Sequence, residues 1–355
     1  MKILVTGAAG FIGYHLVKSL AESNHEVIGL DNINNYYNVD LKFDRLKELG
    51  INKDSAKDFI NLSSSNLFQN FKFIRMNLED RNNLPKLFKN EKFDIVCNLA
   101  AQAGVRYSIE KPRTYLSSNI IGTYNVIEIA HKVKVKHLLL ASSSSIYGAN
   151  KKAPYKENDN VRTQLSIYAA TKLATESLAH AYSNIWSLPI TAIRFFTVYG
   201  PWGRPDMALF KFTKSILKKE KIDVYNNGNL YRDFTYIDDI VKGVSSLINK
   251  IPKNKKNHKM DNTDSLSSVA PFRVVNIGNS KKIKLLDFID ALEDVLKIKA
   301  IRNYMPMQKG DVFMTLANTK LLKKLTGYTP KTNFKEGVKN FVKWYLEYYK
   351  NNKKY

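Results

Sequence analysis

Residues 6–13 read Thr6-Gly7-Ala8-Ala9-Gly10-Phe11-Ile12-Gly13, with three glycines spaced three residues apart. The apolar run Lys2–Val5 precedes them, and Ile12–Glu22 has the periodicity of an amphipathic helix. In such a strand–turn–helix unit the first glycine permits a tight turn, the second lets a pyrophosphate approach the backbone, and the third lets the helix pack on the sheet. Free N–H groups at the start of the helix then face the phosphates. The stretch is a spacing variant of the dinucleotide fingerprint.

An aspartate follows the second apolar run, Glu26–Leu30. Asp31 stands eighteen residues after Gly13, where a carboxylate can accept hydrogen bonds from the adenosine ribose hydroxyls. The same negative charge repels a 2′-phosphate, so the pattern favours NAD over NADP as the cofactor. A plain loop aspartate remains the alternative interpretation of this position.

Short apolar runs alternate with amphipathic stretches over the first 200 residues. The expected strands are Lys2–Val5, Glu26–Leu30, Phe71–Met76, Phe93–Asn98, His137–Ala141 and Thr191–Phe195, and the expected helices are Ile12–Glu22, Arg81–Lys89, Tyr115–Val133 and Ala169–Ser187. Nearly continuous apolar strands indicate a parallel sheet covered on both faces. The alternation predicts right-handed βαβ units and an α/β fold with a Rossmann-type doubly wound parallel sheet.

The remaining segments suggest a division into two parts. Residues 1–198 are expected to form the NAD-binding domain and residues 199–355 a smaller C-terminal α/β substrate domain, with parts of about 232–280 returning to the first. Residues 32–70 are a polar excursion, expected to be partly helical, and Lys250–Val269 is expected to be an exposed loop. Further helices are expected at Met207–Lys219, Asp238–Asn249, Leu285–Leu296 and Phe334–Tyr349.

Composition excludes several classes of protein. A hydrophobic content of 44% and a charged content of 25% are typical of a folded chain rather than a disordered one. The single cysteine, Cys97, excludes a disulfide framework and a cysteine-rich zinc site, and no metal is expected. No window approaches the roughly 20 apolar residues of a membrane span. His15 and Lys18 interrupt the apolar start, which therefore does not resemble a signal peptide, and a cytoplasmic location is predicted.

The net charge of +24 would suit a nucleic-acid-binding protein. However, the chain has 45 Lys and only 11 Arg, and the lysines are spread along its length. This skew is typical of an A/T-rich genome, so no nucleic-acid partner is expected. A diffuse positive field would still draw an anionic small molecule towards a cleft.

A Tyr-x-x-x-Lys pair provides the candidate catalytic groups. Other matches to this spacing are Tyr14/Lys18, Tyr107/Lys111, Tyr147/Lys151 and Tyr349/Lys353. Among them, Tyr168/Lys172 opens a long helix beyond the strand that ends in a run of serines, 142–145. Tyrosine is a poor base because its pKa is near 10, but an ammonium one helical turn away favours the phenolate. The lysine can also hold the nicotinamide ribose, and a serine at the strand end can relay a proton.

Further motifs narrow the resemblance. They are the runs 100–108 (Ala-Ala-Gln-Ala-Gly-Val-Arg-Tyr-Ser), 194–208 (Arg-Phe-Phe-Thr-Val-Tyr-Gly-Pro-Trp-Gly-Arg-Pro-Asp-Met-Ala), 232–240 (Arg-Asp-Phe-Thr-Tyr-Ile-Asp-Asp-Ile) and 310–312 (Gly-Asp-Val). With the fingerprint and the Tyr–Lys pair, they resemble UDP-glucuronate 4-epimerases, which are extended short-chain dehydrogenases/reductases of the NAD-dependent epimerase/dehydratase family. The resemblance covers nearly the whole chain, and residues 194–208 are its most specific part. It implies a tightly bound NAD, a UDP-hexuronate substrate and a homodimer.

The resemblance also implies roles for individual residues. The cofactor contacts that it implies are Gly7, Gly10, Phe11, Ile12, Gly13, Asp31, Asn32, Asn77, Leu78, Leu99, Ala100, Ala101, Gln102, Asn119, Ser143, Tyr168, Lys172 and Phe196. Counting back from Tyr147-Gly148 places the catalytic hydroxyl at Ser143, with Ser145 beside the sugar. The chain departs from its relatives at Asn77, where an aspartate is usual, and at Gln308, where some relatives carry a phosphate-binding arginine. Asn318 also replaces a common aspartate, with no derived consequence.

The substrate contacts that the resemblance implies are Ser143, Ser145, Tyr168, Thr197, Arg204, Tyr225, Arg232 and Asp311. Arg232 is expected to hold the diphosphate and Arg204 the carboxylate, because arginine makes planar bidentate contacts with such groups. An arginine that only braces its loop is the alternative for Arg204, in which case Arg106 or the serines would hold the carboxylate. Tyr225 is expected either to face the uracil or to pack.

Oxidation at C4 would give a 4-ketosugar with three fates. Dehydratases of the superfamily carry an Asp-Glu pair where this chain has Ser144 and Ser145, and the comparable decarboxylases keep a glutamate there. Return of hydride to the other face of the ketosugar needs no further acid, so 4-epimerisation is predicted. The alternatives are a 4-epimerase of neutral UDP-hexoses or, less favoured, a UDP-sugar decarboxylase or dehydratase.

Overall fold

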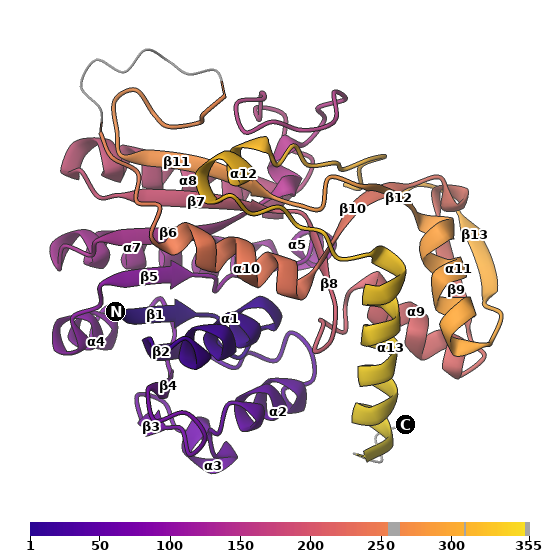
Figure 1. The fold of residues 1–355 in the computed structure, drawn as a ribbon, viewed down its shortest axis with the longest axis horizontal. Coiled ribbons are helices and arrows are strands. Elements are labelled where there is room, and N and C mark those ends of the chain that lie inside the picture. Colours follow the sequence, from indigo (N-terminus) through magenta and orange to yellow (C-terminus); the bar gives the residue numbers. More distant parts are fainter. Residues whose placement is uncertain (255–262, 309, 352–355) are drawn as a thin grey trace.

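An eight-stranded sheet forms the centre of the molecule (Figure 1). The computed structural model describes residues 1–254, 263–308 and 310–351. The strand order is β11-β7-β6-β5-β1-β2-β4-β3. The bounds are β1 (Lys2–Thr6), β2 (Glu26–Asp31), β3 (Leu62–Ser64), β4 (Phe71–Arg75), β5 (Ile95–Asn98), β6 (His137–Ser143), β7 (Ile190–Phe195) and β11 (Phe272–Ile277). Neighbouring strands are parallel, except that β3 runs antiparallel to β4.

Helices cover both faces of this sheet, as the apolar strands predict. In β1 the side chains of Ile3 and Val5 belong to one buried cluster and that of Leu4 to the other, because successive residues of a strand point to opposite faces. On one face α1 (Phe11–Glu22) packs beside α10 (Ile237–Ile248). The other face carries α4 (Asn83–Glu91), α7 (Thr123–Lys132) and α8 (Ile167–Trp186). The predicted doubly wound sheet is confirmed.

The C-terminal part is built from small sheets and helices beside the main sheet (Figure 1). A three-stranded sheet has the order β12-β10-β8, and β13 pairs with β9. The bounds are β8 (Thr197–Tyr199), β9 (Lys221–Tyr225), β10 (Tyr231–Tyr236), β12 (Lys282–Lys284), β13 (Ile301–Met305), α9 (Ala208–Leu217), α11 (Leu285–Leu296), α12 (Lys320–Thr326) and α13 (Phe334–Asn351). Between these pieces the chain returns to the main sheet, where it adds α10 and β11. The domain boundary at residue 198 stays a prediction.

Several elements differ from the sequence-based expectation. The single helix expected over Tyr115–Val133 is divided into α6 (Pro112–Tyr115), the π-helical segment η1 (Leu116–Gly122) and α7. The wide turns of η1 have no signature in apolar periodicity, and such turns often mark functional sites. The polar excursion 32–70 is partly helical as expected, with α2 (Asp40–Glu48) and α3 (Lys53–Lys57), and it also contains β3. Of the loop expected at Lys250–Val269, residues 255–262 lie outside the described part.

Short strands account for the other elements that the patterns do not predict. β8 and β12 have three residues each, and β10 and β13 lack a clear apolar–polar alternation, whereas the five residues of β9 alternate. Among the helices that the structure describes, none combines the length and the apolar character needed to cross a bilayer.

Candidate active site

A cavity of about 900 Å³ lies at the carboxyl ends of β1, β2, β5, β6 and β7. Its far side is formed by the C-terminal part, through residues of β8, β9, β10 and the loop before α9. Open α/β sheets bind their ligands in this crevice, and the volume is at the upper end of the usual range for small-molecule sites. Nearly all the residues predicted to bind cofactor or substrate line this one cavity.

The glycine turn forms one end of the cavity. Gly7 has a φ of +74°, a conformation that other residues rarely adopt, and its carbonyl accepts the Gly10 N–H at 2.9 Å. A Cβ on Gly13 would lie 2.0 Å from the Gly7 carbonyl oxygen, so a side chain at this position would separate the helix from the turn. Helix α1 begins at Phe11 without a side-chain cap, and its first turn holds no acidic residue. This end of the cavity therefore fits a pyrophosphate.

The end of β2 continues the wall of the cavity beside the glycine turn. Asp31 is 7% exposed, and its carboxylate accepts N–H groups of Ala9 at 3.2 Å and Ile33 at 2.7 Å. These main-chain contacts hold the carboxylate beside the glycine turn, where it can accept hydrogen bonds from ribose hydroxyls. Asn32 lines the cavity and donates to the Asn77 side chain at 3.1 Å. Asn77 itself is exposed and does not line the cavity.

The wall beyond β5 is shaped by a residue behind it. Residues 99–102 line the cavity, as do Leu78 and Phe196. Asn119, in η1, is fully buried and exchanges two hydrogen bonds with the main chain of Gln102, at 2.7 and 3.1 Å. Asn119 does not line the cavity. It positions the strand end that does, and its predicted direct contact with a cofactor stays a prediction.

Tyr168, Lys172 and Ser143 meet at the end of β6. Burial raises the pKa of Tyr168, and a hydrogen bond with the Ser143 side chain opposes that rise. Burial lowers the pKa of Lys172 to about 8, although the nearby charge of Glu176 acts in the other direction. The Lys172 ammonium donates to the Ala141 carbonyl at 2.8 Å. Tyr168 lines the cavity, and the buried Lys172 lies one turn further along the same helix, a spacing at which an ammonium favours a phenolate.

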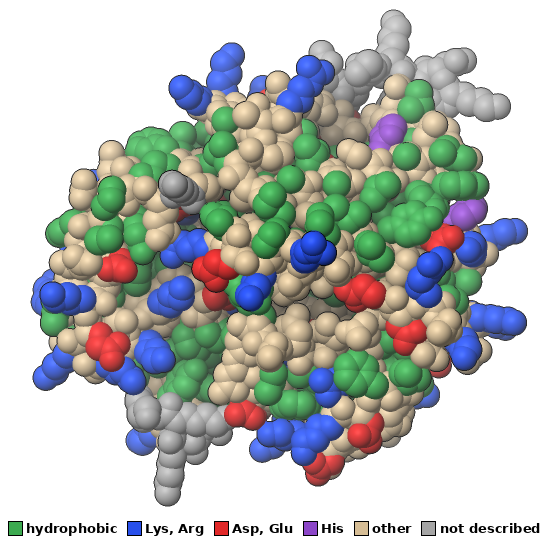
Figure 2. All heavy atoms as spheres, turned by 180° about the vertical axis from the view of Figure 1, so that it is seen from behind, with side chains coloured by type: hydrophobic (Ala, Val, Ile, Leu, Met, Phe, Trp, Pro, Cys, Tyr) green, Lys and Arg blue, Asp and Glu red, His purple; other side chains and the backbone are tan. Residues whose placement is uncertain are grey.

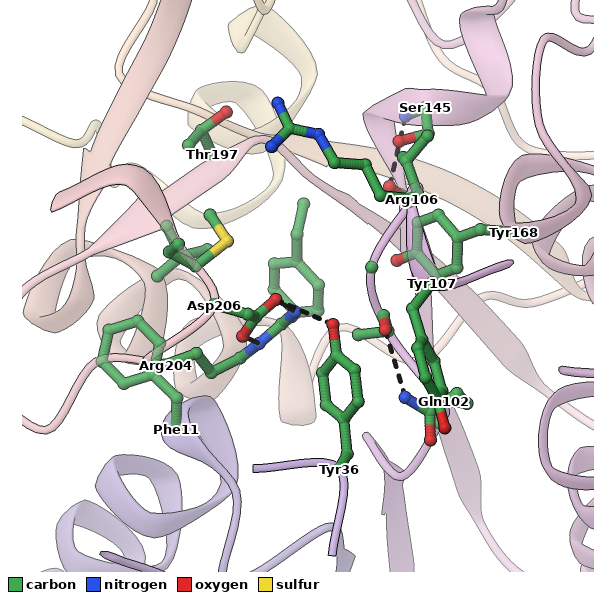
Figure 3. A pocket seen from close by; sticks show the side chains of 18 of the residues that line it. Phe11, Tyr36, Gln102, Arg106, Tyr107, Ser145, Tyr168, Thr197, Arg204 and Asp206 are labelled. Carbon is green, nitrogen blue, oxygen red and sulfur yellow. Dashed lines mark hydrogen bonds and ion pairs between the residues drawn. The ribbon is translucent and has the colours of Figure 1, made fainter. Parts of the chain in front are cut away.

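All four serines of the run 142–145 line the cavity. Ser143 is the last residue of β6, and its Oγ accepts the N–H of Ser145 at 3.2 Å, which caps the short turn η2 (Ser144–Tyr147). Ser143 therefore contacts both Tyr168 and the turn that carries Ser145. Figure 3 shows Tyr168 and Ser145 on the same side of the cavity.

The opposite side holds paired arginines. Arg204 forms a bidentate ion pair with Asp206, with Nε–Oδ1 at 3.0 Å and Nη2–Oδ2 at 2.5 Å (Figure 3). Arg232 donates to the Asp311 carboxylate at 2.7 Å. All four residues line the cavity, and so does Thr197, the first residue of β8. Both predicted anion-binding arginines are therefore already paired with a carboxylate. Gln308, where some relatives carry arginine, does not line the cavity.

Arg106 extends into the cavity from the loop before α5 (Tyr107–Glu110) (Figure 3). Its guanidinium lies 4.8 Å from the centre of the Tyr225 ring, at the end of β9. Among the described arginines that line the cavity, Arg106 is the one without a carboxylate partner. The sequence does not predict this contact, because the two residues lie far apart in the chain.

Sequence patterns also leave out Tyr36, Asp206 and Lys42, which line the cavity. Asp206 stands two residues after Arg204, a spacing that can signal an ion pair in an extended loop. Lys42 lies 4.0 Å from Asp31 and donates to the Asn34 side chain at 2.9 Å. Nothing in the sequence distinguishes Tyr36 from the other 19 tyrosines.

A family model matches the part of the chain that carries most of these features. Residues 3–261 match the model described as the NAD dependent epimerase/dehydratase family. The chain belongs to this family. The family that the sequence motifs indicate is thereby confirmed, and the matched residues include the glycine turn and the Tyr–Lys pair.

Individual epimerase/dehydratase relatives cover nearly the whole chain. Protein CapI of Staphylococcus aureus is 50% identical over 350 residues, which are 99% of this chain and 100% of that protein. A probable UDP-glucuronate 4-epimerase of Rhizobium meliloti (strain 1021) is 44% identical over 352 residues, 99% of this chain and 98% of that protein. The crystal structure of UDP-glucuronic acid 4-epimerase from Bacillus cereus with UDP-glucuronic acid and NAD has a TM-score of 0.83 at 32% identity. The alignment covers 98% of this chain and 100% of that one.

Proposed function

We propose that this chain is an NAD-dependent UDP-glucuronate 4-epimerase, which interconverts UDP-glucuronate and UDP-galacturonate. The observation that carries the proposal is one cavity that joins the glycine turn, the group Tyr168–Lys172–Ser143 and the arginine pair at Arg204. The relatives named UDP-glucuronate 4-epimerase support the choice of substrate.

The residues at the carboxyl ends of the strands would hold the cofactor. The glycine turn and the start of α1 face the pyrophosphate, Asp31 the adenosine ribose, and Lys172 the nicotinamide ribose. NAD held there would supply the acceptor, and later the donor, of the hydride at C4 of the sugar, so the reaction would need no external oxidant. Asn119 acts behind this wall by fixing the main chain of Gln102.

Proton transfer falls to the residues at the end of β6. Tyr168, held as the phenolate by the Lys172 ammonium, takes the proton of the C4 hydroxyl at its phenolic oxygen and becomes the neutral phenol. The Ser143 hydroxyl contacts Tyr168 and lies where it can hydrogen-bond the same sugar oxygen. Ser145 and Thr197 contact the sugar from either side.

The C-terminal side of the cavity recognises the anionic groups of the substrate. Arg204 is assigned to the uronate carboxylate, and Arg232, with its partner Asp311, to the diphosphate. Arg106, which has no carboxylate partner, contributes a second positive charge towards the diphosphate, and Tyr225 beneath it faces the uracil. Residues 199–355 accordingly form most of the nucleotide-sugar-binding domain.

The competing fates are disfavoured by the same cavity. Ser144 and Ser145 stand where elimination or decarboxylation would need an acid, and both line the cavity. A 4-keto uronic acid is a β-keto acid, so its carboxylate must be held against loss of carbon dioxide. An arginine at the cavity wall holds the carboxylate of a uronate in this way. A neutral hexose has no carboxylate for this arginine to bind.

We extend the proposal to the oligomeric state and the cellular location of the enzyme. Exposed apolar side chains lie on η1 (Leu116, 48% exposed; Ile121, 51%) and at the end of α8 (Ile185, 63%; Trp186, 44%). Helix α8 packs against both η1 and α7. Figure 2 shows hydrophobic side chains gathered between charged ones on the side of the molecule opposite to the view of Figure 1. We assign this surface to a homodimer, to be tested by light scattering.

Nucleotide sugars are activated glycosyl donors, so the enzyme is assigned to polysaccharide biosynthesis in the cytoplasm.

Product analysis tests the function directly. The purified protein is incubated with UDP-glucuronate, UDP-glucose or UDP-N-acetylglucosamine, and the products are separated and identified. We expect UDP-galacturonate from the first, with no added NAD, because the cofactor is bound and regenerated. Consumption of added NAD with accumulation of free NADH would contradict an epimerase, and faster turnover of a neutral sugar would contradict the substrate.

A further inference from the structure

The arginine assigned to the uronate carboxylate already has a counter-ion. Arg204 and Asp206 form a bidentate pair, and each side chain is 22% exposed. Burial raises the pKa of Asp206, but the Arg204 charge and a hydrogen bond with Tyr36 outweigh burial, and the pKa is lowered overall. Asp206 is therefore ionised at neutral pH. A uronate bound at Arg204 meets a second carboxylate that competes for the same guanidinium.

Asp206 has a second donor, the Tyr36 hydroxyl, which contacts Arg204 as well. Tyr36, from the loop after β2, donates its hydroxyl to Asp206 Oδ2 at 3.1 Å (Figure 3). The Tyr36 ring packs on Tyr107 with the ring centres 4.8 Å apart. Gly104 leaves room for the hydroxyl, because a Cβ there would lie 2.5 Å from the Tyr36 oxygen. This donor stays with Asp206 when the guanidinium moves away.

During epimerisation Arg204 must release the substrate carboxylate and take another partner. This step rests on the proposed function. Hydride leaves one face of the sugar and returns to the other, while the nicotinamide site is fixed on the sheet side of the cavity. The ketosugar must therefore turn, and its carboxylate must leave the guanidinium during the turn. A partly buried cation without a partner is strongly unfavourable, so the turn would be slow if Arg204 were left alone.

We propose that Asp206 is the exchange partner of Arg204. Asp206 holds the guanidinium whenever the substrate carboxylate does not, and Tyr36 satisfies Asp206 while Arg204 is on the substrate. Both are positioning residues that act through Arg204. Together they make the binding of the uronate looser and the turning of the ketosugar faster.

Asp206→Asn tests the exchange, because asparagine keeps the shape and one acceptor oxygen but removes the competing charge. In a Tyr168→Phe background, where turnover is blocked, we expect calorimetry to show UDP-glucuronate binding about tenfold more tightly. In the otherwise unchanged enzyme, kcat should fall by about tenfold and KM should fall with it. The reduced cofactor should accumulate on the protein, visible by its near-ultraviolet absorbance, because the ketosugar is held longer.

Tyr36→Phe should act in the opposite direction on binding. The ring and its contact with Tyr107 remain, but Asp206 loses the donor that satisfies it when Arg204 leaves. Asp206 then holds Arg204 more firmly, and UDP-glucuronate should bind roughly threefold more weakly. UDP-glucose, which has no carboxylate, should bind each variant within about twofold of the parent.

Asp264→Asn is the matched control. Asp264 forms a bidentate pair with Arg273, at 2.9 and 3.1 Å, outside the cavity. This variant should leave both binding and turnover of UDP-glucuronate unchanged. Weaker binding of UDP-glucuronate to Asp206→Asn, or an equal change for both sugars, would overturn the exchange and leave Asp206 as a brace. Failure of the parent to epimerise UDP-glucuronate would instead overturn the proposed function.

Discussion

The two sides of the cavity hold their polar groups by different means. On the sheet side, Lys172 donates to a main-chain carbonyl and Asp31 accepts main-chain N–H groups. On the C-terminal side, Arg204 and Arg232 are held by carboxylate side chains. The main chain of a central sheet does not move to release a group, whereas a side-chain ion pair can exchange one anion for another.

The difference suits the two tasks. Hydride and proton transfer need groups fixed within a fraction of an ångström, and main-chain contacts provide that. Recognition of an anionic substrate needs cations that can be given up by their partners at low cost. The Arg204 and Arg232 pairs line the cavity and are partly exposed, so an incoming anion can reach each guanidinium before its carboxylate partner has left. The substrate's anions can therefore displace them.

The largest expected effect falls on the sheet side. Tyr168→Phe removes the phenolic oxygen and leaves the ring, so turnover of UDP-glucuronate should fall by about 10² to 10⁴-fold with little change in binding. Steady-state kinetics and calorimetry measure the two quantities. Tyr182→Phe, on the same helix and hydrogen-bonded to Tyr124, is the control and should keep full activity. Near-parental turnover of Tyr168→Phe would mean that another residue is the base.

A smaller but selective effect is expected at Arg204. Arg204→Ala should weaken UDP-glucuronate binding by about 1.5 to 3 kcal/mol, because a charged hydrogen bond is lost. The 4-keto intermediate, no longer held, should lose carbon dioxide and give a 4-ketopentose product, detected by mass. UDP-glucose should bind as it does to the parent. Equal losses on both sugars without decarboxylation would show that Arg204 braces its loop.

Arg232→Ala should affect the two sugars alike. Every UDP-sugar brings the same diphosphate, so the loss of this contact should weaken UDP-glucuronate and UDP-glucose equally, by roughly 1.4 kcal/mol or tenfold. Calorimetry with both ligands, and with UDP alone, measures the change. A loss confined to UDP-glucuronate would reassign Arg232 to the carboxylate.

The smallest effect concerns the stability of the sheet side. The pKa of Lys172 is lowered to about 8 in the folded protein, from 10.5, so its charged form destabilises the fold below pH 8. As the pH rises from 8 to 10.5 this penalty disappears, because the folded protein gives up the proton first. Lys172→Met should therefore abolish activity yet stabilise the nucleotide-free protein at pH 7 by about 1 to 2 kcal/mol.

The pH dependence distinguishes this cause from simple packing. The gain in melting temperature of Lys172→Met over the parent should shrink between pH 8 and pH 10. Lys242→Met, at an exposed position on α10, should show no such trend. A constant gain at every pH would attribute the stabilisation to better packing of methionine.

The residues on the sheet side of the cavity could be predicted from the sequence because the patterns that identify them are local. The glycines at 7, 10 and 13 act within one turn, and Asp31 follows its strand directly. Tyr168 and Lys172 lie one helical turn apart, so their proximity follows from helix geometry alone. The strand–helix alternation places all of them at one edge of a parallel sheet.

The C-terminal side offered weaker signals. Arg204 and Arg232 were predictable as candidates because arginine is rare in this chain, but not as members of ion pairs. β8 has only three residues, and β10 lacks the apolar–polar alternation that indicates a strand. The resemblance implied a cofactor contact for Asn119, which stays a prediction, whereas the position of Asn119 behind Gln102 depends on η1, whose π-helical turns apolar periodicity does not reveal.

The sequence by itself thus determined the doubly wound sheet, the dinucleotide turn and the Tyr–Lys pair, since each follows from contacts within a few residues. The tertiary structure decided which distant side chains meet. Tyr36 and Asp206 are 170 residues apart and Arg232 and Asp311 are 79 apart. No spacing rule relates such residues, because their approach depends on how the C-terminal part packs over the edge of the sheet. For that reason the contact of Tyr36 with Asp206 and the counter-ion of Arg232 became visible in the folded chain alone.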